Sequence, residues 1–287
     1  MKKRNTMIAG ILGALICPLM LLPPKPADVD YETGYEATSL DSTLFYEKQR
    51  LAVADVSTGY RSLAVAESFL GTPYVLGVLD RSQTEKLTVN LRELDCWTFV
   101  ENSVAIAMTA DGKFDSYVRT LEELRYWGGN ISGYGSRIHY FTGWLLQAEK
   151  RGLLQDMTHA MGGIRYEKRI GYISARPHKY PKINNEKVLK DIRMAENRLN
   201  AHEWYFIPQA QIAKMEHLIQ EGDIICITSA KKDLDIAHQG FAVKLNGRIH
   251  LMHASSLSKR VILSRQPLSS YVISQPGQTG IMVARLK

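Results

Sequence analysis

One cysteine of this sequence stands where a helix is expected to begin, in the segment "LDCWTFVENSVAIAM" (residues 94–108). Apolar residues recur there at helical spacing, so the pattern predicts a helix with Asp95 as its N-cap and Cys96 as its first residue. The free N–H groups and the positive end of the helix dipole favour a thiolate at this position, whereas the Asp95 carboxylate opposes one. Cys96 is therefore a candidate nucleophile.

Two histidines converge on a predicted β-hairpin. Asn246 and Gly247 separate two alternating apolar runs, and both residues accept the positive φ angles of a type I′ turn. With this turn, His238 and His253 lie on one face as diagonal neighbours, and His250 lies on the other face. We therefore expect the converging pair to serve the cysteine as base and orienting group, and His250 to be structural.

The other histidine and cysteine positions do not indicate a metal site. His250 and His253 lie three positions apart, so on a strand their imidazoles point to opposite faces. Cys226 lies in the apolar run "GDIICITS" and is predicted to be a core residue, while Cys17 lies in the N-terminal segment. Cys96 and Cys226 have neither the spacing of a zinc site nor the number needed for a disulfide framework. We expect no metal and no cofactor.

The N-terminus has the pattern of an export signal. Lys2, Lys3 and Arg4 precede the uncharged apolar run "MIAGILGALICPLMLLPP", which is typical of a secretory signal peptide or a short membrane anchor. We assign residues 1–27 to this segment, and no clear cleavage site decides between the two. The protein is therefore predicted to be exported, to the periplasm or the cell envelope, with membrane anchoring through this segment as an open alternative.

The charge of the rest of the chain does not point to a nucleic-acid partner. Removing the four cations of the leader lowers the formal net charge from +7 to about +3. The remaining sequence contains no basic run of the kind that forms a nucleic-acid-binding stripe. We expect no nucleic-acid partner, and the sequence does not indicate an oligomeric state.

Five motifs, in this order, resemble those of the NlpC-type papain-like cysteine hydrolases of bacterial cell walls. They are "GTPYVLG" (71–77), "LDCWTF" (94–99), "EGDIICIT" (221–228), "AHQGFAV" (237–243) and "LMHASS" (251–256). The resemblance implies an α+β fold in which the helix carrying the nucleophile Cys96 packs on an antiparallel sheet. It also implies His238 as general base, His253 as the group that orients it, and Tyr74 in the substrate cleft.

Two departures from the common pattern narrow the resemblance. Trp97 follows Cys96 where the family usually has serine, and the separation between Cys96 and His238 is far longer than a minimal domain of this type needs. Both features resemble the N-acetylmuramoyl-L-alanine amidase-like branch. This branch implies hydrolysis of the bond between N-acetylmuramic acid and L-alanine, in peptidoglycan or in a released muropeptide.

The domain prediction follows from the resemblance and from the length of the chain. Residues 28–58 are expected to form a linker with an N-terminal helix, and residues 59–287 a single papain-like catalytic domain. A helical and loop-rich insertion is expected at about 112–215. Within it, residues 116–129 and 140–154 have helical periodicity.

A glycine-rich segment between these two predicted helices carries Tyr134. Its composition suits a mobile binding loop as well as a plain surface connection. Aromatic side chains pack well against sugar rings, so Tyr134 and Trp97 are candidate substrate-binding residues for an amidase that accepts a glycan.

Two alternative functions remain open at this stage. In the endopeptidase relatives an aspartate at the position of Asp95 recognises the free amine of L-alanine, so a γ-D-glutamyl stem-peptide endopeptidase is the first alternative. The second is a non-catalytic envelope-binding module with the same fold. The presence of Cys96, His238 and His253 together speaks against this second alternative.

Overall fold

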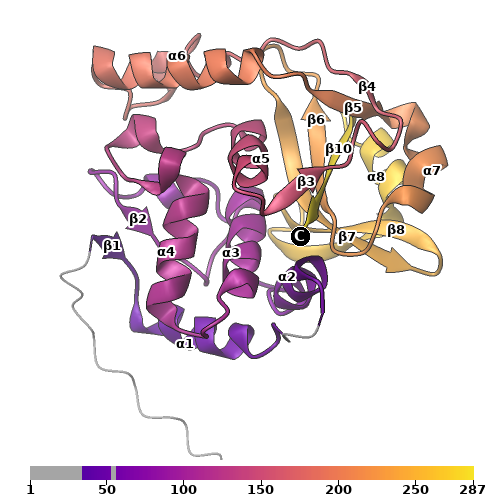
Figure 1. Cartoon of the computed structure of the whole chain (residues 1–287), viewed down its shortest axis with the longest axis horizontal. Helices are drawn as coiled ribbons and strands as arrows, with labels where there is room; N and C mark the ends of the chain where they lie inside the picture. The colour runs from indigo at the N-terminus through magenta and orange to yellow at the C-terminus, as the bar shows by residue number, and fades with distance from the viewer. Residues whose placement is uncertain (1–33, 53–55) are drawn as a thin grey trace, which may run out of the picture.

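The computed structural model describes residues 34–52 and 56–287, so the predicted leader lies outside the described residues. Helices from the first part of the chain stand beside a sheet built from the last part (Figure 1). None of the helices in the described ranges is long and apolar enough to cross a membrane. The structure is a mixed α/β fold with an antiparallel sheet, in agreement with the predicted mixture of helices and antiparallel strands.

The main sheet has the strand order β4-β5-β10-β6-β7-β8-β9, and β3 pairs with β10. All of these pairings are antiparallel. Its strands are β3 (Leu154–Asp156), β4 (Ile164–Arg165), β5 (Tyr205–Pro208), β6 (Ile224–Ser229), β7 (Ile236–Leu245), β8 (Arg248–Ser255), β9 (Arg260–Pro267) and β10 (Gln278–Leu286). A separate parallel pair joins β1 (Tyr35–Glu36) to β2 (Leu87–Thr88).

The α-helices are α1 (Ser39–Gln49), α2 (Thr58–Glu67), α3 (Cys96–Met108), α4 (Phe114–Arg125), α5 (Phe141–Lys150), α6 (Glu186–Asn200), α7 (Ile212–Met215) and α8 (Leu268–Ser274). The two helices predicted in the insertion are α4 and α5. Both end close to the glycines expected to stop them, because Gly128, Gly129 and Gly152 adopt positive φ angles that favour glycine.

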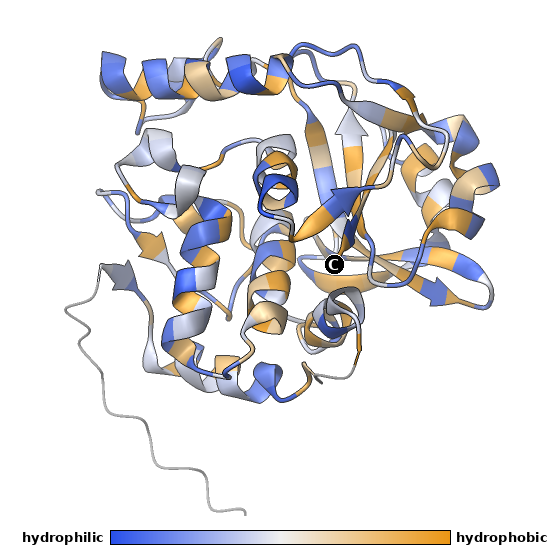
Figure 2. Ribbon diagram, viewed as in Figure 1, coloured by the Kyte–Doolittle hydropathy of each residue, from blue (hydrophilic) through white to orange (hydrophobic). Residues whose placement is uncertain are grey.

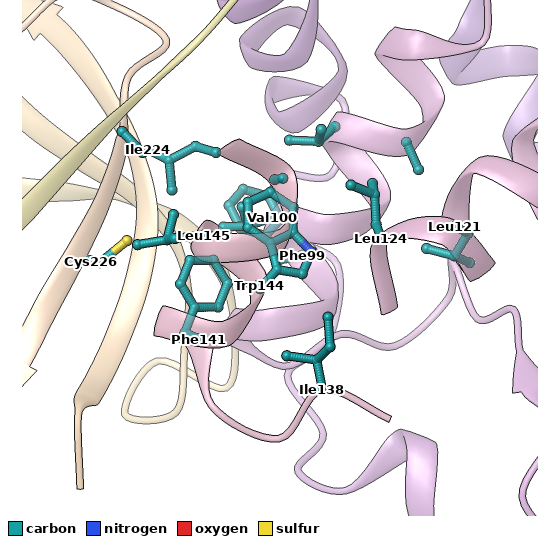
Figure 3. Close-up of a cluster of buried hydrophobic side chains, with 14 of the residues drawn as sticks. Phe99, Val100, Leu121, Leu124, Ile138, Phe141, Trp144, Leu145, Ile224 and Cys226 are labelled. Carbon is teal, nitrogen blue, oxygen red and sulfur yellow. The ribbon is translucent and has the colours of Figure 1, made fainter. Parts of the chain in front are cut away.

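Two apolar layers cover the two faces of the sheet. On one face, side chains from α3, α5 and the strands form the larger core, which includes Phe99, Trp144 and Ile224 (Figure 3). Cys226 lies in this core and is fully buried, which confirms its predicted position. On the other face, Leu268 and Val272 of α8 pack with strand residues in a second cluster. Figure 2 shows the apolar residues on the central strands and inner helices, whereas the outlying α6 carries many hydrophilic residues.

The hairpin of β7 and β8 has the predicted turn and register. Asn246 has φ 51° and Gly247 has φ 77°, as a type I′ turn requires. The opposed pairs are Leu245 with Arg248, Val243 with His250, Ala242 with Leu251 and Phe241 with Met252. The prediction of the hairpin is therefore confirmed.

The alternation of the hairpin residues is also confirmed. Phe241 belongs to the larger core, whereas Ala242 and Leu251 belong to the cluster on the opposite face. His250, on the Phe241 face, is buried and has its Nδ1 atom 2.9 Å from the carbonyl oxygen of Ser264. This contact gives His250 the polar partner that a structural histidine needs.

Candidate active site

Cys96 is the first residue of α3, and Asp95 is its N-cap, as predicted. Oδ1 of Asp95 accepts hydrogen bonds from the backbone N–H of Thr98 (2.8 Å) and from its hydroxyl (2.9 Å). The Thr98 hydroxyl oxygen in turn accepts from the N–H of Asp95 at 2.9 Å. This reciprocal cap holds the first turn of the helix, and with it the cysteine, in a defined position.

The environment of the thiol keeps it protonated. Burial, and secondly the negative charge of Asp95, raise the pKa of Cys96 to about 12. Backbone N–H groups of Gln239, Cys96 and Trp97 oppose this increase but do not outweigh it. The start of the helix therefore favours the thiolate and Asp95 opposes it, as expected, but desolvation exceeds the influence of the helix start and leaves the thiol protonated.

His238 and His253 meet as the hairpin register requires. Nε2 of His238 lies 2.6 Å from Nδ1 of His253, and the two rings are nearly perpendicular. Burial lowers the pKa of His238 to about 4. Burial and the proximity of His238 lower the pKa of His253 to about 3. Both imidazoles are therefore neutral at pH 7, and one N–H proton connects them.

The sulfur of Cys96 contacts strand β7 because Cys96 lies at the N-terminal end of α3. The body of α3 packs on the opposite face of β7, where Phe99 contacts Phe241 with ring centroids 5.8 Å apart. Cys96, at the first turn, instead receives the backbone N–H of Gln239, the neighbour of His238. A β-bulge lies beside this point, since Ala237 has no partner between the pairs of β6 and β7. Bulges re-aim the adjacent side chains, and this one precedes His238 directly.

Two of the predicted substrate-binding residues lie next to the cysteine. The backbone of Tyr74 pairs with that of Leu94, two residues before Cys96. The Tyr74 side chain is partly exposed, and its pKa is raised by burial and then by the charges of Cys96 and Asp95. Trp97 is also partly exposed, with its indole N–H 3.3 Å from Oε1 of Glu101. The indole ring contacts Phe141 edge-on and packs against the larger core, while its exposed part lies next to Cys96.

Tyr134 lies in a different environment from the open loop that was expected. It is 8% exposed, its ring contacts His139, and the cations of Arg137 and Lys182 lie over the ring face. Arg137 and Lys182 also form ion pairs with two carboxylates, those of Asp80 and Glu85. We call Asp80, Glu85, Tyr134, Arg137, His139 and Lys182 the insertion charge cluster. The contacts of Tyr134 connect it to this cluster rather than to Cys96.

Tyr271 of α8 was not identified from the sequence. Its ring contacts that of His253, with centroids 5.2 Å apart. Burial, and secondly the ionised form of Cys96, raise the pKa of Tyr271 to about 12. The seven-residue helix α8 offers no motif around this tyrosine, and only the packing of α8 on the sheet brings it to the site.

Comparison with known proteins assigns the family. Residues 64–281 match the N-acetylmuramoyl-L-alanine amidase-like family. Two crystal structures of an N-acetylmuramoyl-L-alanine amidase from Bacteroides uniformis are 35% and 34% identical to this chain, with TM-scores of 0.75 and 0.77. They cover 79% and 80% of this chain and 98% and 99% of their own.

Two further solved structures are similar to this chain. A Bacteroides fragilis structure, named provisionally as a xylanase, is 33% identical with a TM-score of 0.73, over 77% of this chain and 99% of its own. A Legionella pneumophila protein of 22% identity shares the fold, with a TM-score of 0.68. No curated protein matches the chain. The match over residues 64–281 and the Bacteroides uniformis structures show that this chain belongs to the N-acetylmuramoyl-L-alanine amidase-like family.

Proposed function

We propose that this protein is a cysteine-dependent amidase that hydrolyses the bond between N-acetylmuramic acid and L-alanine in peptidoglycan or muropeptides. Membership of the family gives a cell-wall amidase-like function. The cysteine mechanism rests on one observation, the 2.6 Å contact between His238 and His253 on the hairpin whose Gln239 N–H points at the Cys96 sulfur. The arrangement supplies a nucleophile, a base and an orienting group of the NlpC-type, papain-like kind.

The resting site holds a neutral thiol and a neutral imidazole, so the proton moves during the attack. Nε2 of His238 is engaged with His253, which leaves Nδ1 of His238 to take the thiol proton. Sγ of Cys96 then forms a bond to the lactyl carbonyl carbon. The C–N bond breaks as the proton passes to the amine of L-alanine, and a thioester remains on the cysteine.

Hydrolysis of the thioester uses the same base. His238 takes a proton from water, the resulting hydroxide adds to the thioester carbonyl, and the thiolate of Cys96 leaves and is reprotonated. The products are a lactyl carboxylate on the sugar and a peptide that begins with L-alanine. The backbone N–H of Cys96, at the open start of α3, is the donor best placed to stabilise the negatively charged oxygen in both steps.

The carboxylates beside the cysteine favour this chemistry over glycoside hydrolysis. Glycosidases as a rule use two carboxyl groups placed on either side of the scissile bond. Here Asp95 caps α3, and Glu101 is fully buried against Arg125 at 2.7 Å. Both carboxylates therefore have structural partners, which supports amide hydrolysis at the thiol.

Asp95 also bears on the alternative that the stem peptide is cut. A γ-D-glutamyl endopeptidase needs a carboxylate to bind the free amine of L-alanine, whereas an amidase must accept a sugar in that direction. One oxygen of Asp95 is committed to the helix cap, and burial raises the pKa of this carboxyl. Trp97 and Tyr74 are partly exposed beside it and suit the faces of a sugar. These contacts favour the amidase.

The products of muropeptide digestion test the proposal. The purified protein and its Cys96→Ala variant are each incubated with a disaccharide-tetrapeptide, and the products are weighed by mass spectrometry. We expect the intact disaccharide and a free peptide beginning with L-alanine, formed only by the unaltered protein. The free tetrapeptide, whose L-alanine amine is unblocked, serves as a second substrate. Release of L-alanyl-D-glutamate from the free tetrapeptide alone would establish the endopeptidase instead, and binding of both substrates without any product would establish an envelope-binding module.

The proposed place of action follows from the leader. The basic and apolar pattern of residues 1–27 indicates export to the periplasm or cell envelope, where the substrate is found. A reporter enzyme fused after residue 30 should be active outside the cytoplasm, and a reporter confined to the cytoplasm would contradict this part of the proposal.

A further inference from the structure

We propose that Tyr271 is a positioning residue, whose aromatic ring holds His253, and through it His238, in the orientation that proton transfer needs. The inference rests on the proposed function, because it assigns a role within the same site. It concerns a residue outside the motifs, on a helix that comes from the far end of the chain.

The imidazole of His253 is oriented by one hydrogen bond and by its packing between two rings. Its ring lies between two other rings, that of His238 at a centroid distance of 4.7 Å and that of Tyr271 at 5.2 Å. Nδ1 of His253 is bonded to His238, but its Nε2 atom is buried and has no hydrogen-bond partner among the described residues. One hydrogen bond alone leaves an imidazole free to turn about that contact. The packing of Tyr271 supplies the second restraint.

The tautomer of each histidine also depends on the orientation of His253. Nδ1 of His238 can accept the thiol proton only if the proton of the neutral ring is on Nε2, from where it is donated to Nδ1 of His253. The proton of neutral His253 is then on its own Nε2 atom. If His253 turned over, it would present a donor to a donor, and His238 would lose its orientation. A fixed orientation of His253 is therefore a condition for the base to function.

A cavity lies beside the rings of His253 and Tyr271. His253 and Tyr271 both line a cavity of about 260 Å³, together with Ser255, Ser264 and Gln266. A small side chain at position 271 would enlarge this cavity and let the imidazole swing into it. The tyrosine itself is held in place, because Leu268 and Val272 of α8 are fully buried against the sheet.

The variants of the test separate the ring from the hydroxyl. Tyr271→Phe keeps the ring, Tyr271→Leu keeps much of the volume without a ring, and Tyr271→Met is a second ringless variant in case Leu lowers the melting temperature. Ile273→Ala is the matched control, since this residue lies on the same helix and is 60% exposed. The melting temperature of each variant shows whether it folds.

The measurement is the rate at which iodoacetamide alkylates Cys96, followed by mass spectrometry of the peptide that contains it. No substrate is needed, and the fully buried Cys226 serves as the internal unreactive thiol. The rate reports on deprotonation by His238. Misplacing an orienting group commonly lowers a reaction rate tenfold or more. We therefore expect the alkylation rate of a ringless variant that folds to fall about tenfold. Tyr271→Phe and Ile273→Ala should remain within about twofold of the unaltered protein, since neither removes the ring.

The outcomes distinguish this inference from the function on which it rests. A folded ringless variant with the unaltered rate would overturn it, and so would a Tyr271→Phe variant that falls as far as Tyr271→Leu, because the hydroxyl would then be responsible. Histidine ¹⁵N spectra should show the Nε2–H tautomer of His253 in Tyr271→Phe and a mixture in Tyr271→Leu. If alkylation depends on the ring but no muropeptide is cut, the amidase proposal fails while the positioning role of Tyr271 stands.

Discussion

The candidate active site and the insertion charge cluster both bury polar side chains, but they stabilise them differently. In the active site, Cys96, His238 and His253 are neutral, and the Nε2 atom of His253 has no hydrogen-bond partner within residues 34–52 and 56–287. In the insertion charge cluster, Arg137 is buried as a cation between two carboxylates. Ionised groups with partners resist change, whereas neutral groups with a spare position can exchange protons. The difference indicates a reactive site in one region and a structural clamp in the other.

The insertion charge cluster joins three segments that are far apart in the chain. Asp80 and Glu85 precede β2, Arg137 follows the glycine-rich segment, and Lys182 precedes α6. Arg137 also donates to the carbonyl oxygen of Leu79 at 2.9 Å. These contacts tie the segment that leads from Tyr74 to Cys96 to the insertion. The cluster therefore supports the wall of the site from outside it.

The largest expected difference is between the two described cysteines. Cys96→Ala should lower muropeptide hydrolysis by at least about a thousandfold, because the nucleophile is lost, with little change in melting temperature. The matched variant, Cys226→Ala, should keep its activity per folded molecule, since it only removes a sulfur from the core. Activity assays and thermal unfolding of both variants measure this. Comparable activity in the two variants would remove Cys96 from the mechanism.

Substitution of the three histidines of the hairpin should lower kcat by different amounts, according to the contacts of each histidine. His238→Ala should lose about a thousandfold in kcat, and His253→Ala about ten- to a hundredfold, because the base remains when its orienting group is lost. His250→Ala should stay within about threefold, since its contact is with a backbone carbonyl on the other face. Steady-state kinetics measure all three. A greater loss at His250 than at His253 would contradict the assignment of faces.

Stability should respond most in the insertion charge cluster. Arg137→Met leaves Glu85 buried with Lys182 as its remaining cation, so we expect the free energy of unfolding to fall by about 3 kcal/mol. The exposed pair of Arg81 and Glu93 provides the control, and Arg81→Met should cost less than about 1 kcal/mol. Urea unfolding measures both. Loss of activity in folded Arg137→Met, without loss of stability, would give the cluster a direct part in the reaction.

The stability contributed by the active site should depend on pH through His253. The pKa of His253 in the folded protein, about 3, is below its ordinary value of 6.5, so the unfolded chain binds the extra proton as the pH falls below 6.5. The stability that this residue contributes is complete above pH 6.5 and declines towards pH 3. At pH 4.5 the decline should amount to about 1–3 kcal/mol.

The variant His253→Asn isolates this contribution. Its free energy of unfolding should change less between pH 7 and pH 4.5 than that of the unaltered protein, whereas His217→Asn, at an exposed position, should change as much. Urea titrations at the two pH values provide the comparison. Equal slopes in the three proteins would show that His253 is not held as a neutral group.

The smallest effect is expected at Tyr134. Its ring, rather than its hydroxyl, makes the contacts with His139 and the two cations, so Tyr134→Phe should change stability by less than about 0.5 kcal/mol and leave turnover unaltered. Melting temperature and kcat/KM report the two quantities. A raised KM in this variant would return Tyr134 to the substrate cleft, where the sequence suggested it.

Local features of the site could be predicted from the sequence because they depend on neighbours in the chain. The helix start at Cys96 follows from a cap and an apolar spacing, and the pairing of His238 with His253 follows from the two turn residues of the hairpin. Helix and strand periodicity likewise located α4, α5 and the buried strand of Cys226. The net acidity of the thiol did not follow, since it depends on how completely the folded chain removes water.

What the sequence determined by itself was therefore the set of reactive residues and the face of the strand on which each histidine lies. The tertiary structure decided which distant groups join them: Gln239 at the sulfur, Tyr271 at His253, and the cations that hold Tyr134 in the insertion charge cluster. The physical reason is range. Caps, turns and alternation act over a few residues, whereas desolvation, ring packing and ion pairing depend on segments brought together only by the folded core.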